Sequence, residues 1–469
     1  MKSRSARLIP LLVLATVLVS LVPLGSLNHV EAESAHTTAL FTGTMEDGST
    51  YRIEVPPNWN GTLVLYSHGY VTPGSSNLAQ DAPDAVTGAF LLGQGYALAG
   101  SSYSQTGWAV QQAFTDQIAV LGIFDDIVKM HPQRTIAWGD SLGGMITAGL
   151  IQLYPHTFTA ALSMSGVLGG AVGTWNTALD GAFAVNLLLA NNTLQIVHIN
   201  PATAQHNLAT GLAALEQAQA TPQGRARIAL AAALSDVSGW FTPGSPEPAA
   251  HDYAAREYNE YLWLKHVGLP FALVFRTDIE ARAGGNPSWN TGVNYFHQFA
   301  ISAEKQTARG LYATAGLSLE QDLKRLQTAP RIAADPAAVR YLTKYITYNG
   351  HISVPMLTMH DVGDGFVINQ NERAYATIVR RAGNAPLLRQ TFIDRAGHDV
   401  YTPAERIAAF MALIHRVDTG KWQNSTSPDV LNRAAMALGP SFSPLPPSFI
   451  QFEPTLYPRP YYATYGRHE

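Results

Sequence analysis

The sequence predicts an α/β fold in which a mostly parallel sheet is flanked by helices and interrupted by a mainly helical insertion. Two observations carry this prediction. Short apolar runs alternate with segments of helical period in the first and last parts of the chain, which is typical of a parallel sheet covered on both faces. Between about residues 170 and 350, long Ala/Leu-rich helical patterns instead follow one another without strand signals.

The elements of the first part follow in a regular order. An alternating segment at 38–56, with a Gly-containing turn, predicts a β-hairpin. Within 115–131, Val120, Ile123, Phe124 and Ile127 share one helical side at i, i+3, i+4 and i+7 spacing. Another helical segment begins directly after residue 141. Short apolar runs predict strands at 61–69, 95–103, 135–141 and 158–166.

Strand and helix alternation returns after residue 350. Strands are expected at 354–364 and 388–399, each followed by a helical pattern. The last part is rich in Pro and Tyr and shows no repeat, so we expect it to lie over the surface. The predicted organisation is a core at 33–169 and 351–418, a helical cap or lid at 170–350, and a C-terminal tail at 419–469.

The N-terminus has the order of a secretory signal peptide at 1–32. Basic MKSRSAR precedes the apolar LIPLLVLATVLVSLVPLG, and a small-x-small pattern ends at Ala32. We expect cleavage there and a secreted, extracellular protein without a stable membrane span. The alternative is a retained anchor, which Pro10 and Pro23 disfavour. Because the chain has no cysteine, it must be stable without disulfides, which favours a bacterial source.

Composition argues against several classes of protein. Hydrophobic residues make up 46% and charged residues 14% of 469 residues, so disorder is not expected. The net charge of −4 gives no reason to expect nucleic acid as a partner. No H-E-x-x-H motif occurs and DVGDG is too short for an EF-hand loop, so neither a metal nor another cofactor is expected.

Ser141 is the candidate nucleophile. It stands between Gly139 and Gly143, after an apolar strand and before a helix. A nucleophilic serine at such a sharp turn needs small residues two positions before and two after it, because larger side chains would collide there. The alternative is an ordinary Gly-rich turn that needs small residues for packing alone.

Two backbone amides are candidates for the oxyanion hole that acyl transfer requires. Leu142, directly after the serine, supplies the first amide. Tyr70 supplies the second, because Gly69 lets the chain turn inward at the end of the first core strand. His68 in the same segment is expected to brace that loop rather than to act as a base.

The candidate acid and base lie in the last part of the chain. Asp364 follows a strand that ends near His360 and is the favoured acid, with Asp361 as the fallback. Either aspartate could instead cap its own turn. His398, in a Gly-preceded loop after the last strand, is the candidate base that takes the serine proton, although it could also be an ordinary polar loop residue.

Two more aspartates flank the candidate base. Asp394 and Asp399 are close to it in sequence but would have to point the same way as the triad acid, so neither is the expected partner of the imidazole. With an ordinary imidazole as base, activity should fall below about pH 6.

In these motifs the chain resembles α/β-hydrolase fold enzymes of the esterase and lipase kind. HGY, GDSLGG, HDVGD and AGHD occur in the family's order, over roughly 40–170 and 350–418. The resemblance implies Ser141 as nucleophile, Asp364 as acid, His398 as base, and the amides of Tyr70 and Leu142 as oxyanion hole. HDVGD departs from many members, which have Gly after the His.

The long separation between the candidate serine and acid leaves room for a cap after the fourth core strand. Caps of this kind cover the serine and commonly form an apolar acyl or aromatic pocket. The insertion's tryptophans could line such a pocket or fill the cap's own core: Trp175, Trp240, Trp263 and Trp289.

The expected function is that of a secreted serine hydrolase that cleaves carboxylic esters, small or polymeric, through an acyl-enzyme. A peptidase or amidase with the same triad is the alternative, because only the leaving group differs. A non-catalytic binding protein on this fold is a further possibility, which would usually have lost a triad member.

Overall fold

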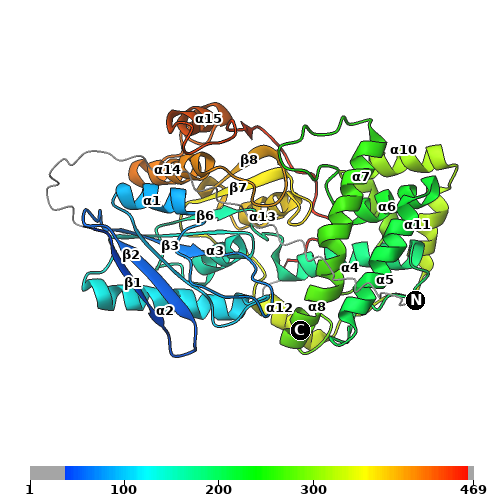
Figure 1. Ribbon diagram of the computed structural model, residues 1–469, viewed down its shortest axis with the longest axis horizontal. Coiled ribbons are helices and arrows are strands. Elements are labelled where there is room, and N and C mark those ends of the chain that lie inside the picture. The colour runs from blue at the N-terminus through cyan, green and yellow to red at the C-terminus, as the bar shows by residue number, and fades with distance from the viewer. Residues whose placement is uncertain (1–36, 463–469) are drawn as a thin grey trace, which may run out of the picture. The chain divides into compact units, whose positions relative to one another are not determined.

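The computed structural model describes residues 37–462, so the expected signal peptide lies outside the described residues. Within that range, nine strands form one sheet in the order β1-β2-β4-β3-β5-β6-β7-β8-β9 (Figure 1). The strands are β1 Ala39–Thr44, β2 Thr50–Val55, β3 Thr62–Ser67, β4 Ala97–Ser101, β5 Arg134–Asp140, β6 Ala160–Met164, β7 Met356–Gly363, β8 Leu388–Ala396 and β9 Phe449–Ile450.

The inner part of the sheet is parallel and its edges are antiparallel. Strands β4, β3, β5, β6, β7 and β8 pair in parallel. The hairpin of β1 and β2 joins one edge through β4, and β9 joins the other through β8. The predicted fold class, a mostly parallel sheet flanked by helices, is therefore confirmed.

Alternate residues of the inner strands face two different hydrophobic clusters. In β3, Leu63 and Leu65 pack into the cluster that contains α2 and α3, whereas Val64 packs into the cluster of α1, α14 and α15. Both faces of the sheet are thus covered, as parallel sheets require. The helices of the core are α1 Ala85–Gly93, α2 Val110–Val128, α3 Leu142–Leu153, α13 Gln370–Arg381, the 3₁₀ turn η3 Ala385–Leu387, α14 Pro403–Thr419 and α15 Pro428–Ala437.

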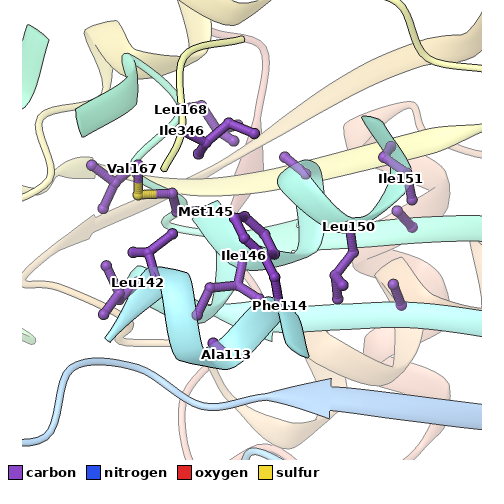
Figure 2. Packing of buried hydrophobic residues seen from close by; sticks show 14 of the residues in the cluster. Ala113, Phe114, Leu142, Met145, Ile146, Leu150, Ile151, Val167, Leu168 and Ile346 are labelled. Carbon is purple, nitrogen blue, oxygen red and sulfur yellow. The ribbon is translucent and has the colours of Figure 1, made fainter. Parts of the chain in front are cut away.

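Helix α3 starts directly after Ser141 and is buried along almost its whole length. Figure 2 shows Met145, Ile146 and Leu150 of this helix among the side chains of neighbouring elements, including Phe114 from α2. Each such buried side chain contributes about 1.5–3 kcal/mol relative to an exposed one. This packing keeps the start of the helix, and with it residue 141, in a defined place.

The stretch between β6 and β7 is helical, with two π-helical segments, η1 and η2, between α7 and α8. It has its own hydrophobic cluster, separate from those on the sheet, and is drawn in green to yellow in Figure 1. Its elements are α4 Gly170–Leu188, α5 Ala204–Gln219, α6 Pro222–Ser235, α7 Tyr253–Trp263, η1 Leu264–Gly268, η2 Phe271–Phe275, α8 Arg276–Ala283, α9 Tyr295–Ile301, α10 Lys305–Ala315, α11 Leu319–Thr328 and α12 Pro336–Lys344.

The C-terminal segment is more ordered than its composition suggests. It contains helix α15 and strand β9, and residues 457–459 lie along the helical insertion. There Tyr457 is buried, and Arg459 Nη1 lies 2.6 Å from Asp180 Oδ2 of α4. No helix among residues 37–462 is both long enough and apolar enough to span a membrane.

Candidate active site

Ser141 lies at a strained turn between β5 and α3. Its φ of 56° and ψ of −120° form a backbone conformation that non-glycine residues rarely adopt. The turn is possible because glycines surround it. A Cβ on Gly143 would lie 1.8 Å from the Ser67 carbonyl oxygen, and one on Gly139 would lie 2.4 Å from the same atom. The glycine spacing is therefore a steric requirement of this turn.

The structure brings Ser141, His398 and Asp364 together in one hydrogen-bonded chain. His398 Nε2 lies 2.8 Å from Ser141 Oγ, and His398 Nδ1 lies 2.6 Å from Asp364 Oδ2. Serine comes from the β5–α3 turn, aspartate from the end of β7, and histidine from the loop between β8 and α14. All three follow the carboxyl ends of parallel strands, which meet at one edge of the sheet.

Asp364 is held from several sides. Its Oδ1 accepts hydrogen bonds from the amides of Phe366 and Val367, at 2.8 and 3.0 Å. Burial alone would raise the pKa of Asp364. The charges of His398 and His360 outweigh burial and keep this pKa below its usual value. The carboxylate is thus ionised and oriented toward the imidazole.

His360 lies behind Asp364 and is fully buried. Its Nδ1 is 3.2 Å from Glu372 Oε1, and its Nε2 is 2.6 Å from the Val367 carbonyl oxygen and 3.6 Å from Asp364 Oδ2. Because both nitrogens face acceptors, each carries a proton. Burial would lower the pKa of His360, but Asp364 and Glu372 raise it to about 10. The sequence analysis placed His360 only near the end of a strand and missed its role behind Asp364, since Glu372 meets it only through the packing of α13.

The other aspartates near His398 have different positions. Asp361, the fallback acid, is buried and accepts a hydrogen bond from the Val400 amide at 3.1 Å, so it holds the histidine loop rather than the imidazole. Asp394 is exposed on β8. Asp399 Oδ2 lies 3.3 Å from Nε2 of His398, the nitrogen that also contacts Ser141.

The loop that carries Tyr70 lies against the serine. A Cβ on Gly69 would be 3.4 Å from Ser141 Cβ. Among the described residues, the amides of Tyr70 and Leu142 donate no hydrogen bond, so both remain available. His68 is buried, with its ring stacked on Tyr103 and its nitrogens 2.7 and 3.1 Å from the carbonyl oxygens of Gly69 and Ser102.

An apolar cavity of about 70 Å³ lies beside the site, between α4, the η1–η2 region and the loop after β7. Phe366 lines this cavity, and its ring is also edge-on to the His398 ring, at 5.2 Å between centroids. Phe366 therefore separates the cavity from the imidazole.

None of the four insertion tryptophans lines this cavity. Trp175 stacks on Phe271 in the buried core, and Trp263 packs edge-on against Phe241. Trp289 contacts Tyr461 of the tail, and Trp240 lines a polar cleft near the end of β7. Within residues 37–462, no group of three His, Cys, Asp or Glu side chains is placed to hold a metal ion.

A sequence comparison with characterised proteins shows the family to which the chain belongs. The chain is 30% identical over 439 residues to o-phthalyl amidase of Xanthobacter agilis, covering 87% of this chain and 94% of the amidase. The chain belongs to the family of that amidase, and its fold is that of the α/β-hydrolases. It is a hydrolase. No protein-family model matches this hydrolase.

Solved structures similar to this hydrolase include esterases and peptidases. Feruloyl esterase B of Aspergillus oryzae is 14% identical, with 81% of this chain and 80% of that chain covered and a TM-score of 0.38. Acylaminoacyl peptidase of Pyrococcus horikoshii is 10% identical, with 81% and 41% covered and a TM-score of 0.37. This hydrolase thus spans about two fifths of the peptidase.

Proposed function

We propose that the protein is a secreted serine hydrolase that cleaves carboxylic esters through an acyl-enzyme on Ser141. The observation that carries this proposal is the hydrogen-bonded chain from Ser141 Oγ through His398 to Asp364, with distances of 2.8 and 2.6 Å. Nucleophile, base and orienting acid in this arrangement recur in unrelated serine hydrolases. The leader that motivates secretion lies outside the described residues.

In the proposed acylation, neutral His398 takes the Ser141 proton through Nε2 while Oγ attacks the ester carbonyl carbon. The amides of Tyr70 and Leu142 bind the resulting oxyanion. His398 then gives the proton to the departing alkoxide oxygen as the C–O bond breaks, which leaves an acyl group on Oγ. Water attacks that group with His398 again as base, releases the carboxylic acid and restores the serine.

Asp364 has an orienting role in this proposal. Its hydrogen bond to Nδ1 keeps Nε2 directed at the serine and stabilises the imidazolium that forms. His360 and Glu372 stand behind it. The positive charge of His360, whose Nε2 lies 3.6 Å from Asp364 Oδ2, supports an ionised carboxylate. The acid therefore need not take up a proton during the cycle.

The apolar cavity behind Phe366 is the proposed site for the acyl group. Its volume of about 70 Å³ is less than half of the ~150 Å³ that hold a benzene ring in an engineered protein cavity. A short acyl chain fits this space as it stands, whereas an aromatic acyl group requires Phe366 or a neighbouring side chain to move.

Amide hydrolysis is the second candidate function, and the similarity of the chain to o-phthalyl amidase favours it. The acyl-enzyme is the same for an ester and for the matching amide, because only the leaving group changes. An alcohol leaves more easily than an amine, so an enzyme that cleaves an amide is also expected to cleave the corresponding ester.

Two measurements test the proposal. A fluorophosphonate probe should label the wild-type protein at Ser141 and leave Ser141→Ala unlabelled. Comparing kcat/KM for p-nitrophenyl esters and matching p-nitroanilides, including an o-phthalyl anilide, then assigns the leaving group. A wild-type protein with no labelling and no turnover of either class would instead be the non-catalytic binding protein.

A further inference from the structure

Asp399 stands at the nitrogen through which the proposed base exchanges its proton. Its Oδ2 is 3.3 Å from His398 Nε2, and Ser141 Oγ is 2.8 Å from the same nitrogen. The backbone explains this placement. Residue 399 has a φ of 58°, a left-handed conformation that Asp and Asn tolerate better than most residues, and the turn directs its side chain back over the preceding ring.

The carboxylate of Asp399 depends on that nitrogen for a donor. Within residues 37–462, its Oδ1 is buried without a hydrogen-bond partner, and Oδ2 has only the contact with Nε2. An ionised carboxylate in such a position is stabilised most when Nε2 carries a hydrogen that it can contact. When the imidazole is neutral, the Nε2 lone pair instead faces a negative charge.

We propose that Asp399 is a positioning residue that competes with Ser141 for Nε2 of His398 and holds the resting enzyme in its imidazolium form. This inference rests on the proposed function. In the resting state the Nε2 proton points between Oγ and Asp399, so the serine cannot transfer its own proton. Loss of this proton to water frees the lone pair for Ser141. During turnover, the same carboxylate stabilises the imidazolium that forms when Oγ attacks.

The charges around this pair favour the same conclusion. Burial would lower the pKa of His398, but Asp364 and Asp399, with a smaller part from Asp361, raise it to about 9. Burial raises the pKa of Asp399 to about 7; Asp140 and Asp364 act in the same direction, and His398 and Arg406 act against it. Between about pH 7 and pH 9 both partners of the pair are therefore charged.

Arg406 does not neutralise Asp399. Its Nη2 is 3.5 Å from the backbone oxygen of Asp399 and 3.8 Å from Asp140 Oδ2, and its Nη1 is 3.4 Å from Asp84. Tyr66 donates a hydrogen bond to Asp140 at 3.0 Å. Nε2 of His398 is therefore the cationic donor closest to the Asp399 carboxylate among the contacts of the described residues.

The test is the acid limb of the pH profile of kcat/KM on a p-nitrophenyl ester. In the wild-type enzyme this limb should lie near pH 9, above the ordinary histidine value. Asp399→Asn removes the charge and keeps a residue that suits the left-handed backbone. A nearby opposite charge shifts a pKa by about one unit or more, so the limb should move down by about one unit. Because the carboxylate also stabilises the imidazolium that forms during attack, the plateau of kcat/KM above the limb should be lower in the variant, and the position of the limb is the readout.

Asp399→Gly is the second variant, because it removes the whole side chain and also suits the backbone. Asp394→Asn is the matched control: it removes the same charge from an exposed position on β8. Both Asp399 variants should move the limb, and the control should not. An unmoved limb in both Asp399 variants, or an equal shift in the control, would overturn the inference.

A measurement without turnover separates this inference from the proposed function. The imidazole of His398 can be titrated by NMR and assigned by its loss in His398→Gln. Its pKa should fall in Asp399→Asn whether or not the protein cleaves an ester. Absence of turnover together with that fall would contradict the proposed function and leave the role of Asp399 intact, whereas an unchanged titration would contradict the role of Asp399.

Discussion

The turn at 139–144 and the loop at 397–401 both present a functional atom at the same edge of the sheet, but different forces hold them. In the serine turn, Gly143 packs so closely on the Ser67 carbonyl that no Cβ fits. In the histidine loop, carboxylates hold the backbone and the ring, with Asp361 at the Val400 amide and Asp364 at Nδ1. The serine therefore depends on packing and the histidine on charge, which makes only the second sensitive to pH.

The largest effect is expected when the reacting side chain is removed from the serine turn or from the histidine loop. Ser141→Ala and His398→Ala should each lower kcat by roughly 10⁴-fold or more, because members of such a triad act as a unit. The double variant should be hardly worse than either single one. Steady-state kinetics on a p-nitrophenyl ester measures this, and additive losses would contradict the proposed unit.

The two aspartates that hold the histidine loop give the next comparison. Asp364→Asn should lower kcat by about 10⁴-fold, since an amide stabilises the wrong tautomer of the ring. Asp361→Asn keeps an acceptor for the Val400 amide and should stay within about tenfold of wild type, because it leaves the ring's own partner in place. Retained turnover in Asp364→Asn with loss in Asp361→Asn would transfer the acid role to residue 361.

The serine turn should respond to volume instead. Gly143→Ala forces the chain away from the Ser67 carbonyl, and a displacement of about 1 Å at a reacting atom can cost roughly 10²-fold in rate. Gly122→Ala is the control: it adds the same methyl group in α2, where nothing lies within 4 Å, and should leave kcat/KM unchanged. Equal kinetics for the two variants would show that the turn tolerates a Cβ.

The smallest effect is the response to pH near neutrality. Below about pH 9 the imidazole is mostly charged and cannot accept the serine proton, so activity should rise roughly tenfold for each pH unit toward that value. If activity has already reached its plateau at pH 7, the charges around His398 do not raise the pKa of its imidazole. For an ordinary imidazole we expected the acid limb of the pH profile near pH 6. We now expect it near pH 9, because the fold brings several carboxylates close to the His398 ring.

Much of the site could be predicted because its determinants are local in sequence. The glycines around Ser141 indicate the turn, and the chain order of serine, aspartate and histidine indicates which strand ends to inspect. The structure places Asp364, and not Asp361, beside the ring. Short apolar runs between segments of helical period likewise predicted the strands of the parallel sheet.

The remaining features depend on tertiary contacts that no local pattern encodes. Glu372 reaches His360 only because α13 packs beside β7, and the left-handed backbone at Asp399 directs its side chain to Nε2. An Asp directly after a candidate base, at a position that needs a positive φ, is the signal that could have indicated this contact. Strand β9 has only two residues, too few for a periodic pattern to reveal it.

The contact between Arg459 and Asp180 bears on how the protein can be shortened or tagged. Asp180 is fully buried, and Arg459 lies only a few residues before the end of the described chain. Breaking a buried ion pair by removing one partner costs about 3–5 kcal/mol. A recombinant version that stops before residue 459 should therefore melt at a lower temperature, with its first loss of amide protection from hydrogen exchange in α4.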